Sequence, residues 1–208
     1  MRNKAAKILI TTGIVCVLAA LSLFLYNQFR SYNAGVYSQE IMVALKTAID
    51  ADKKADNSSQ PSADTHSSDN STGGSSIDRT TVLGSEYIGY LSIPTLALEL
   101  PVMADWSYEK LDQAPCRYAG SPETDDFVIA AHNFSTHFGY IGHLTTGDQV
   151  SFTDIHGRRT DYKVILTDTL SPTSVSDMTS GEYALTLFTC TYSGQARVTV
   201  RLQRRATT

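Results

Sequence analysis

The sequence has few cysteines and no surplus of basic residues, and each shortage excludes a class of protein. Its 208 residues include three cysteines, too few for the disulfide framework of a small secreted scaffold. Lysine and arginine number 17 against 21 aspartate and glutamate residues, which gives a formal net charge of -4 and a pI of about 5.7. A nucleic-acid-binding domain carries a basic face, so this balance argues against nucleic acid as a partner.

Two further absences divide the chain. Residues 8–26 contain no charged side chain, and a helix of that length rises about 28 Å, close to the thickness of a bilayer's hydrocarbon core. Residues 55–80 contain almost no large apolar side chain, so they cannot bury enough surface to offset the entropy of ordering. The length of the chain then leaves room for one folded domain after this segment.

The apolar run predicts an uncleaved, single-pass transmembrane signal-anchor over residues 8–27. Three basic residues precede it, which by the positive-inside rule places residues 1–7 in the cytoplasm and the rest of the chain outside the cell membrane. A cleaved signal peptide and a lipoprotein signal are the alternatives. The run is longer than the roughly 7–15-residue apolar region of a signal peptide, and Cys16 follows bulky Ile14 and Val15 rather than a small residue.

Residues 28–54 form a juxtamembrane segment that could be a helical stalk. Ile41, Leu45 and Ile49 fall on one face of a helix, together with two alanines. This face is compatible with an ordinary stalk, and also with a helix that associates with the membrane surface or with another copy of itself.

The folded domain is expected over residues 83–205, after a disordered linker over residues 55–82. One short helix is expected at 107–113, with Ser107 as its N-cap, and a long polar connection at 171–182. About eight strands with little helix indicate an all-β closed barrel or sandwich. The expected strands lie at residues 87–93, 97–103, 127–131, 149–155, 161–168, 186–190 and 198–202.

One cysteine near the end of the chain lies in the sequence context of a reactive site. Cys190 ends an apolar, β-prone run, the turn signal Ser193-Gly194 follows, and a second such run begins after Arg197, which predicts a hairpin. Residues that face each other across such a pair are about 5 Å apart at Cβ, so Cys190 and Arg197 can be neighbours. A guanidinium favours the thiolate form of cysteine, and His132, after an apolar strand, is a candidate acid and base.

The run Thr186-Leu187-Phe188-Thr189-Cys190 resembles the Thr-Leu-x-Thr-Cys signature of the sortases, the cysteine transpeptidases that attach proteins to Gram-positive cell surfaces. The family's downstream arginine and its histidine after an apolar strand match Arg197 and His132, although the family often has Gly where Ala131 stands. The resemblance covers roughly residues 87–201. It implies an eight-stranded sortase-type β-barrel with short helices, preceded by the N-terminal transmembrane helix and the flexible linker.

The resemblance also implies a mechanism and partners. Cys190 would attack the carbonyl of a sorting-signal peptide to give a thioester, with His132 transferring protons and Arg197 binding the carbonyl or oxyanion. Thr189 and Thr191, on either side of the nucleophile, are the expected substrate or oxyanion positions. The acceptor would be an amine of a peptidoglycan precursor or of a pilin. A cysteine hydrolase of cell-wall peptides and a tethered, non-catalytic binding module are the alternatives.

Size gives an indication of the sortase class. The short interval between His132 and Cys190 leaves no room for the extra helix typical of class B. The linker has neither the Asp-Pro nor the aromatic residue of the lid typical of class C, and the chain ends at Thr208 without a second apolar segment. In size, the chain therefore resembles the sortases of class A or D.

No cofactor is expected, although two clusters raise the question. Three histidines lie close together in the sequence, but their spacing does not match a helical zinc site. Three acidic residues carry the hard oxygen ligands that calcium prefers, but a solvated turn is the favoured interpretation. The histidines are His132, His137 and His143, and the acidic residues are Glu123, Asp125 and Asp126.

Cys116 has three open interpretations. It could be a buried packing residue, a free thiol or a redox partner of Cys190. The sequence favours the first, since free cysteines are among the most buried residues.

Overall fold

The structure is a computed structural model that describes residues 2–58 and 77–205. The helices are α1 (Arg2–Ser58), α2 (Tyr108–Leu111) and α3 (Val175–Met178), with 3-10 turns η1 (Pro94–Leu96) and η2 (Ile141–His143). The strands are β1 (Thr80–Val82), β2 (Ser85–Ile93), β3 (Leu98–Met103), β4 (Cys116–Ala119), β5 (Phe127–Ala130), β6 (Gln149–Asp154), β7 (Arg159–Leu170), β8 (Leu185–Cys190) and β9 (Arg197–Arg204).

Eight of the nine strands close into a barrel. Their order is β2-β3-β4-β5-β8-β9-β7-β6, and β6 pairs with β2 to complete the ring, while β1 adds a short extension to β2. Gly89 lies where β2 meets β6; its φ is +147°, and a Cβ there would fall 2.1 Å from the Thr153 carbonyl oxygen. Only glycine permits this close approach of two backbones. The expected all-β fold with an eight-stranded barrel is confirmed.

Apolar side chains that alternate along the strands fill the inside of the barrel. Phe127 and Phe152, both members of this cluster, meet edge to face with ring centroids 5.1 Å apart. Fully buried members from five strands of the ring are Leu91, Ile129, Val164, Leu187, Val200 and Leu202. This packing fixes which side chains of β5, β8 and β9 face inward, and thereby which face outward towards a site.

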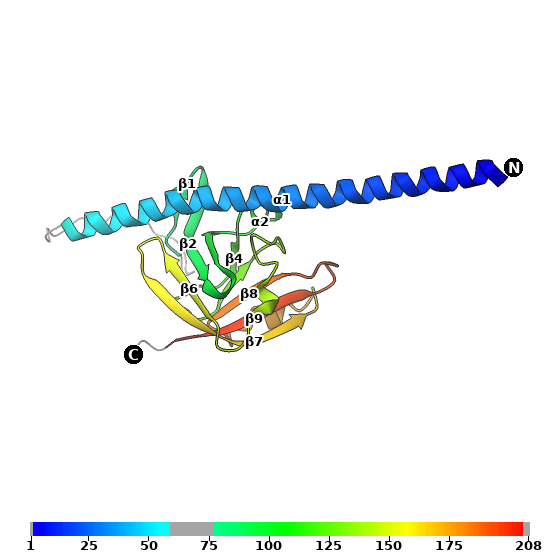
Figure 1. Cartoon of the computed structure of the whole chain (residues 1–208). Coiled ribbons are helices and arrows are strands. Elements are labelled where there is room, and N and C mark those ends of the chain that lie inside the picture. The colour runs from blue at the N-terminus through cyan, green and yellow to red at the C-terminus, as the bar shows by residue number, and fades with distance from the viewer. Residues whose placement is uncertain (1, 59–76, 206–208) are drawn as a thin grey trace.

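A second core lies between α1 and the outside of the barrel. The part of α1 after residue 30 crosses the barrel wall, as Figure 1 shows, and buries one stripe of side chains. Ile41, Leu45 and Ile49 are 0%, 0% and 4% exposed. Their barrel partners are Val82, Tyr87, Met103, Leu111, Ala114, Cys116 and Ala130. The sequence pattern predicts this helix and its apolar face; the structure adds that the barrel covers that face.

The ends of the expected linker are ordered in the structure. α1 continues to Ser58 and β1 begins at Thr80, both inside the range 55–82, of which residues 59–76 lie outside the described residues. β1 is held because it pairs with β2 across the Leu83-Gly84 turn and because Val82 is buried in the second core. The disordered-linker prediction is therefore wrong for residues 55–58 and 80–82.

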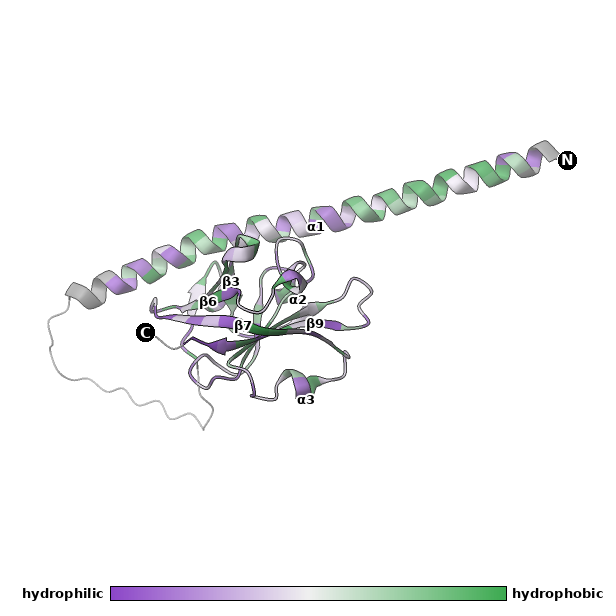
Figure 2. Cartoon of the chain, turned by 60° about the horizontal axis from the view of Figure 1, so that its bottom comes forward, coloured by the Kyte–Doolittle hydropathy of each residue, from purple (hydrophilic) through white to green (hydrophobic). Residues whose placement is uncertain are grey.

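The N-terminal half of α1 projects beyond the barrel (Figure 1). Figure 2 shows this half as mainly hydrophobic, and its large side chains from Ile8 to Tyr26 are exposed. By length and composition, α1 is long and apolar enough to cross a membrane.

Leu45→Ala should destabilise the folded domain by about 2–5 kcal/mol, because the substitution leaves a cavity in the second core. Val43→Ala is the matched control, since Val43 lies on the same helix and is 71% exposed. Thermal unfolding of the full-length chain in detergent measures both. Equal unfolding midpoints for the two variants would contradict the packing of α1 on the barrel.

Candidate active site

The hairpin of β8 and β9 positions a cysteine opposite an arginine. Cys190 is the register partner of Arg197 in the last pair before the turn that connects the two strands. The connecting turn is closed by hydrogen bonds from the Thr191 amide to the Ala196 carbonyl (3.0 Å) and from the Gly194 amide to the Thr191 carbonyl (2.8 Å). The predicted hairpin and the Cys190–Arg197 pairing are both present.

The parallel pairing of β5 with β8 brings the histidine to the same place. The Ala131 amide donates to the Phe188 carbonyl (3.2 Å), and the Thr189 hydroxyl donates to the Ala131 carbonyl (2.8 Å). These two bonds hold the end of β5 against the end of β8. His132 is the next residue along the chain, so its position follows from the strand pairing.

A groove of about 190 Å³ joins the three candidate residues. His132, Cys190 and Arg197 all line it, as does Thr189. The Thr189 hydroxyl is used by the Ala131 carbonyl, and the Thr191 hydroxyl accepts a hydrogen bond from the Ala196 amide (3.2 Å) inside the turn. The two threonines therefore shape the backbone around Cys190, and a direct role in substrate binding stays a prediction.

His132 has a carboxylate partner that the sequence did not reveal. Its Nε2 lies 3.0 Å from Oδ1 of Asp112, the residue that ends α2. Burial lowers the pKa of His132 below its ordinary value, the Asp112 carboxylate raises it in part, and the Arg30 guanidinium lowers it again. Because burial is the largest effect, the imidazole is mainly neutral near pH 7.

Arg197 is anchored by the same turn that carries Cys190. Its Nη1 donates to the carbonyls of Gly194 and Ala196, each at 3.2 Å. A guanidinium has five N–H donors, so others remain for a ligand in the groove.

A protein-family model described as "Sortase domain" matches residues 91–205, more than half of the chain. The chain belongs to the sortase family.

Solved sortases share the fold of this sortase at low identity. Sortase C1 of GBS pilus island 1 is 22% identical, with a TM-score of 0.51 over 59% of this chain and 66% of that one. The Clostridium perfringens sortase D5 transpeptidase is 19% identical, with a TM-score of 0.52 over 58% and 79%. Sortase C1 from Streptococcus suis is 24% identical, with a TM-score of 0.51 over 59% and 74%. A search of curated proteins found no match.

Aromatic side chains form one wall of the groove of this sortase. Trp106 packs against Tyr108 and Tyr118, with ring centroids 5.6 and 5.4 Å apart, and Tyr118 meets Phe188 edge to face at 5.2 Å. All four line the groove. The wall comes from three separate chain segments, so it is visible only once the barrel has formed.

Arg201 corrects one sequence expectation. Alternation along the sequence of β9 predicts that Arg201 shares a polar face with Arg197 and Thr199, yet Arg201 and Thr199 are 2% and 0% exposed. The segment containing α3 covers this face: the Arg201 guanidinium donates to the carbonyls of Asp177 (2.9 Å) and Met178 (3.4 Å). Since Met178 lines the groove, Arg201 fixes the side of the groove formed by α3.

The remaining cysteine and histidine candidates lie outside the groove. Burial raises the pKa of Cys116 to about 12, and its thiol donates to the Ala114 carbonyl at 3.4 Å, as expected of a packing residue. Burial lowers the pKa of His137 to about 4, and its Nε2 is 3.3 Å from the Ser38 hydroxyl of α1. His143 is exposed and stacks on Tyr140.

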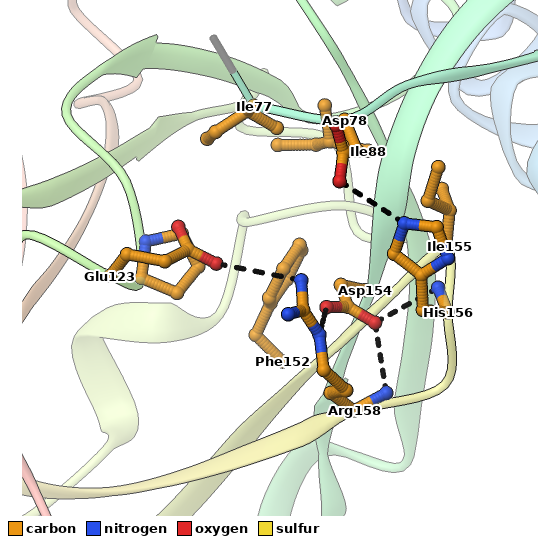
Figure 3. Close-up of a pocket in the computed structure, with 10 residues that line it drawn as sticks. Ile77, Asp78, Ile88, Glu123, Phe152, Asp154, Ile155, His156 and Arg158 are labelled. Atoms are coloured by element: carbon orange, nitrogen blue, oxygen red, sulfur yellow. Dashed lines mark hydrogen bonds and ion pairs between the residues drawn. The ribbon is translucent and has the colours of Figure 1, made fainter. Parts of the chain in front are cut away.

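A second pocket, of about 240 Å³, lies at a separate place on the barrel, and charged side chains span it (Figure 3). Arg158 contacts Asp154 at 2.6 Å and Glu123 at 3.9 Å, and His156 contacts Asp78 at 3.1 Å. On α1, Asp52 lies 3.2 Å from the other ring nitrogen of His156. The ion pairs around this pocket therefore link α1, the segment before β1 and the β6–β7 turn to one another.

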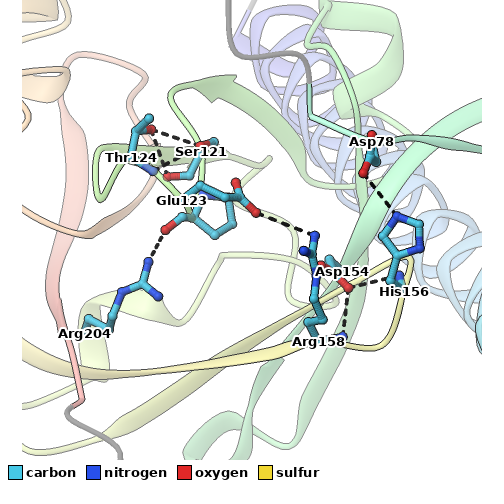
Figure 4. Close-up of polar contacts among 9 residues, drawn as sticks. Asp78, Ser121, Glu123, Thr124, Asp154, His156, Arg158 and Arg204 are labelled. Carbon is cyan, nitrogen blue, oxygen red and sulfur yellow. Dashed lines mark hydrogen bonds and ion pairs between the residues drawn. The ribbon is translucent and has the colours of Figure 1, made fainter. Parts of the chain in front are cut away.

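The acidic residues near this pocket are bound to protein groups. Asp125 pairs with Arg204 at 2.7 Å, and Asp126 accepts hydrogen bonds from the Ser121 amide and the Thr124 hydroxyl. Figure 4 shows Ser121, Thr124 and Arg204 beside Glu123. The expectation that the chain needs no cofactor remains a prediction.

His156→Gln should reduce stability at acidic pH only. Asp52 and Asp78 raise the pKa of His156, so its contribution is fully present below about pH 6.5 and is lost as the pH rises through the raised value. Unfolding midpoints of variant and wild type should differ at acidic pH, below about 6.5, and converge at alkaline pH, where the histidine has lost its proton. His143→Gln, at an exposed histidine, is the control. A pH-independent difference would contradict the ionic role.

Proposed function

We propose that this sortase is a membrane-anchored cysteine transpeptidase, which cleaves a sorting signal in surface proteins and transfers it to an amine of the cell wall or of a pilin. The observation that carries the proposal is the meeting of Cys190, Arg197 and His132 in one groove, through strand pairings that involve all three chain segments. Family membership supports the same chemistry.

In the first half of the reaction the Cys190 thiolate attacks the carbonyl carbon of the sorting signal. The oxyanion that forms accepts hydrogen bonds from the Arg197 guanidinium. The carbon–nitrogen bond then breaks, and the leaving amine takes a proton from the His132 imidazolium, which leaves a thioester on Cys190.

In the second half an acceptor amine attacks the thioester carbonyl. Neutral His132 removes the proton from the attacking nitrogen, the carbon–sulfur bond breaks, and the thiolate of Cys190 is restored. The product is a new amide bond, so no net oxidation or reduction occurs. With water in place of the amine, the same steps would give hydrolysis.

Protonation limits the active fraction of the enzyme. With ordinary pKa values of about 8.5 for Cys and 6.5 for His, the thiolate–imidazolium pair amounts to about 1% of the neutral pair. Burial of His132 lowers its pKa further and makes this pair rarer. The proposed enzyme therefore works through a minor, correctly protonated population.

The anchor proposal rests on the continuity of α1. Its apolar half would span the membrane with residues 1–7 in the cytoplasm, and the same helix continues into the half that packs on the barrel. From Tyr26 to Arg30 the helix rises about 6 Å. The groove would therefore lie close to the outer membrane surface, where a membrane-held substrate emerges.

Cys190→Ala should abolish transfer without unfolding the barrel, because the thiol is the nucleophile. Full-length enzyme in detergent is incubated with sorting-signal peptides from surface proteins of the same organism, and intact mass detects the acyl-enzyme. Wild type should gain the mass of the acyl fragment at Cys190, and hydroxylamine should release it as the hydroxamate. Cys116→Ala, at a buried cysteine, is the matched control and should still be acylated. An acyl adduct on Cys190→Ala, or none on wild type with any peptide, would contradict the proposal.

Arg197→Lys should lose roughly 100- to 1,000-fold in turnover although it keeps the charge, since a loss of one oxyanion donor has that effect. Lysine is a point charge on a flexible stem and cannot reproduce the planar fork of donors. Rates of Cys190 alkylation against pH separate the two roles of the arginine. Turnover of the lysine variant within a few-fold of wild type would leave Arg197 with an electrostatic role only.

A further inference from the structure

The docked half of α1 lies on the loop that carries the candidate catalytic histidine. The Thr136 hydroxyl donates to the Ser31 carbonyl (2.8 Å), and the hydroxyls of Ser31 and Ser135 lie 3.1 Å apart. At Gly35 a Cβ would fall 2.7 Å from Thr136, so the helix and the loop are in close contact there. This stretch of α1 therefore forms part of the support of the loop after β5.

One ion pair connects α1 to the candidate catalytic histidine. Arg30 of α1 donates to Oδ1 of Asp112, the same oxygen that lies 3.0 Å from Nε2 of His132. The Arg30 guanidinium also lies 5.6 Å from the centroid of the Phe134 ring, and that ring lies 4.8 Å from the His132 ring. His132 is therefore held on one edge by Asp112 and on one face by Phe134, and both of these groups contact Arg30.

We propose that Asp112 is a positioning residue for His132 and that Arg30 holds Asp112 in position, so that the membrane-proximal part of α1 completes the active site. This inference rests on the proposed function, because it assigns a task to the histidine of that mechanism. Neither Asp112 nor Arg30 lines the groove, so both act through His132.

The contact selects which nitrogen of His132 transfers protons. A carboxylate can only accept, so Asp112 requires the hydrogen on Nε2 and fixes that tautomer. Nδ1 is then the nitrogen that gives a proton to the leaving amine and takes one from the acceptor. Arg30 shares the Asp112 oxygen, and its positive charge lowers the pKa of His132, which limits how strongly Asp112 raises the basicity of the imidazole.

A second ion pair between α1 and the barrel provides a matched control. Lys46 of α1 donates to Glu99 of β3 at 2.6 Å, with both side chains about half exposed, as in the Arg30–Asp112 pair. Lys46 lies four helical turns further along α1 and lines no part of the groove. If Arg30 acted only as a tether for the helix, loss of Lys46 should have an equivalent effect.

The test is the titration of His132 by NMR, in full-length enzyme in detergent with labelled histidine. Asp112→Asn should lower the pKa of His132 and weaken the preference for the Nε2–H tautomer, because an amide can either accept or donate at this position. Arg30→Met should raise the pKa, Arg30→Lys should restore it towards wild type, and Lys46→Met should leave it unchanged. Phe134 and His137, which also lie near the ring, are not substituted in any of the four variants. Unfolding midpoints confirm in each sample that α1 is still packed.

Activity is the second readout. Asp112→Asn should lose roughly 10- to 100-fold in kcat/KM, a part of the 100- to 10,000-fold that general acid–base catalysis contributes, and its pH profile should shift in the direction of the His132 pKa. Shifts in the same direction for Asp112→Asn and Arg30→Met, or in neither, would overturn the inference. The titration needs no turnover, so failure of the transpeptidase proposal and failure of this inference give different results.

Discussion

The candidate active site depends on the hydrogen bonds that join the end of β5 to the end of β8. The Ala131 amide and carbonyl are held by Phe188 and Thr189 respectively. Without these bonds the histidine after β5 and the cysteine at the end of β8 would belong to separate loops. With them, the distance between the two residues is set by a parallel ladder inside a closed barrel, whose geometry the inner core maintains.

The outside of the barrel is organised around the same point. α1 covers the loop after His132, Asp112 caps the C-terminus of α2, and the segment containing α3 closes the groove through Arg201. Arg201 is buried with neutral partners, two main-chain carbonyls and the Thr186 hydroxyl among them, and with the face of Tyr183. A buried cation in this setting stabilises only if its hydrogen bonds are kept, so it strongly favours one arrangement of the α3 segment.

Features that depend on residues close together in the sequence could be predicted, whereas contacts between distant segments could not. The hairpin, the pairing of Cys190 with Arg197 and the Ser107 cap follow from patterns within a few residues, and the structure contains all three. The strand β4 was missed because its four residues are mixed in polarity and are held by pairing with β5. Asp112 and Arg30 were missed because they are 82 positions apart in the sequence, and nothing local marks either as a partner of the other.

The central claim is that one strand arrangement presents a nucleophile, a proton carrier and an oxyanion donor to a single carbonyl group. A crystal structure of the full-length protein with a sorting-signal mimic attached to Cys190 through a disulfide tests it most directly. The mimic's carbonyl oxygen is expected within hydrogen-bond distance of the Arg197 guanidinium, with Nδ1 of His132 facing the position of the leaving nitrogen. A mimic that lies away from Arg197, or an imidazole that has left Asp112 and faces away from the carbonyl, would contradict the account.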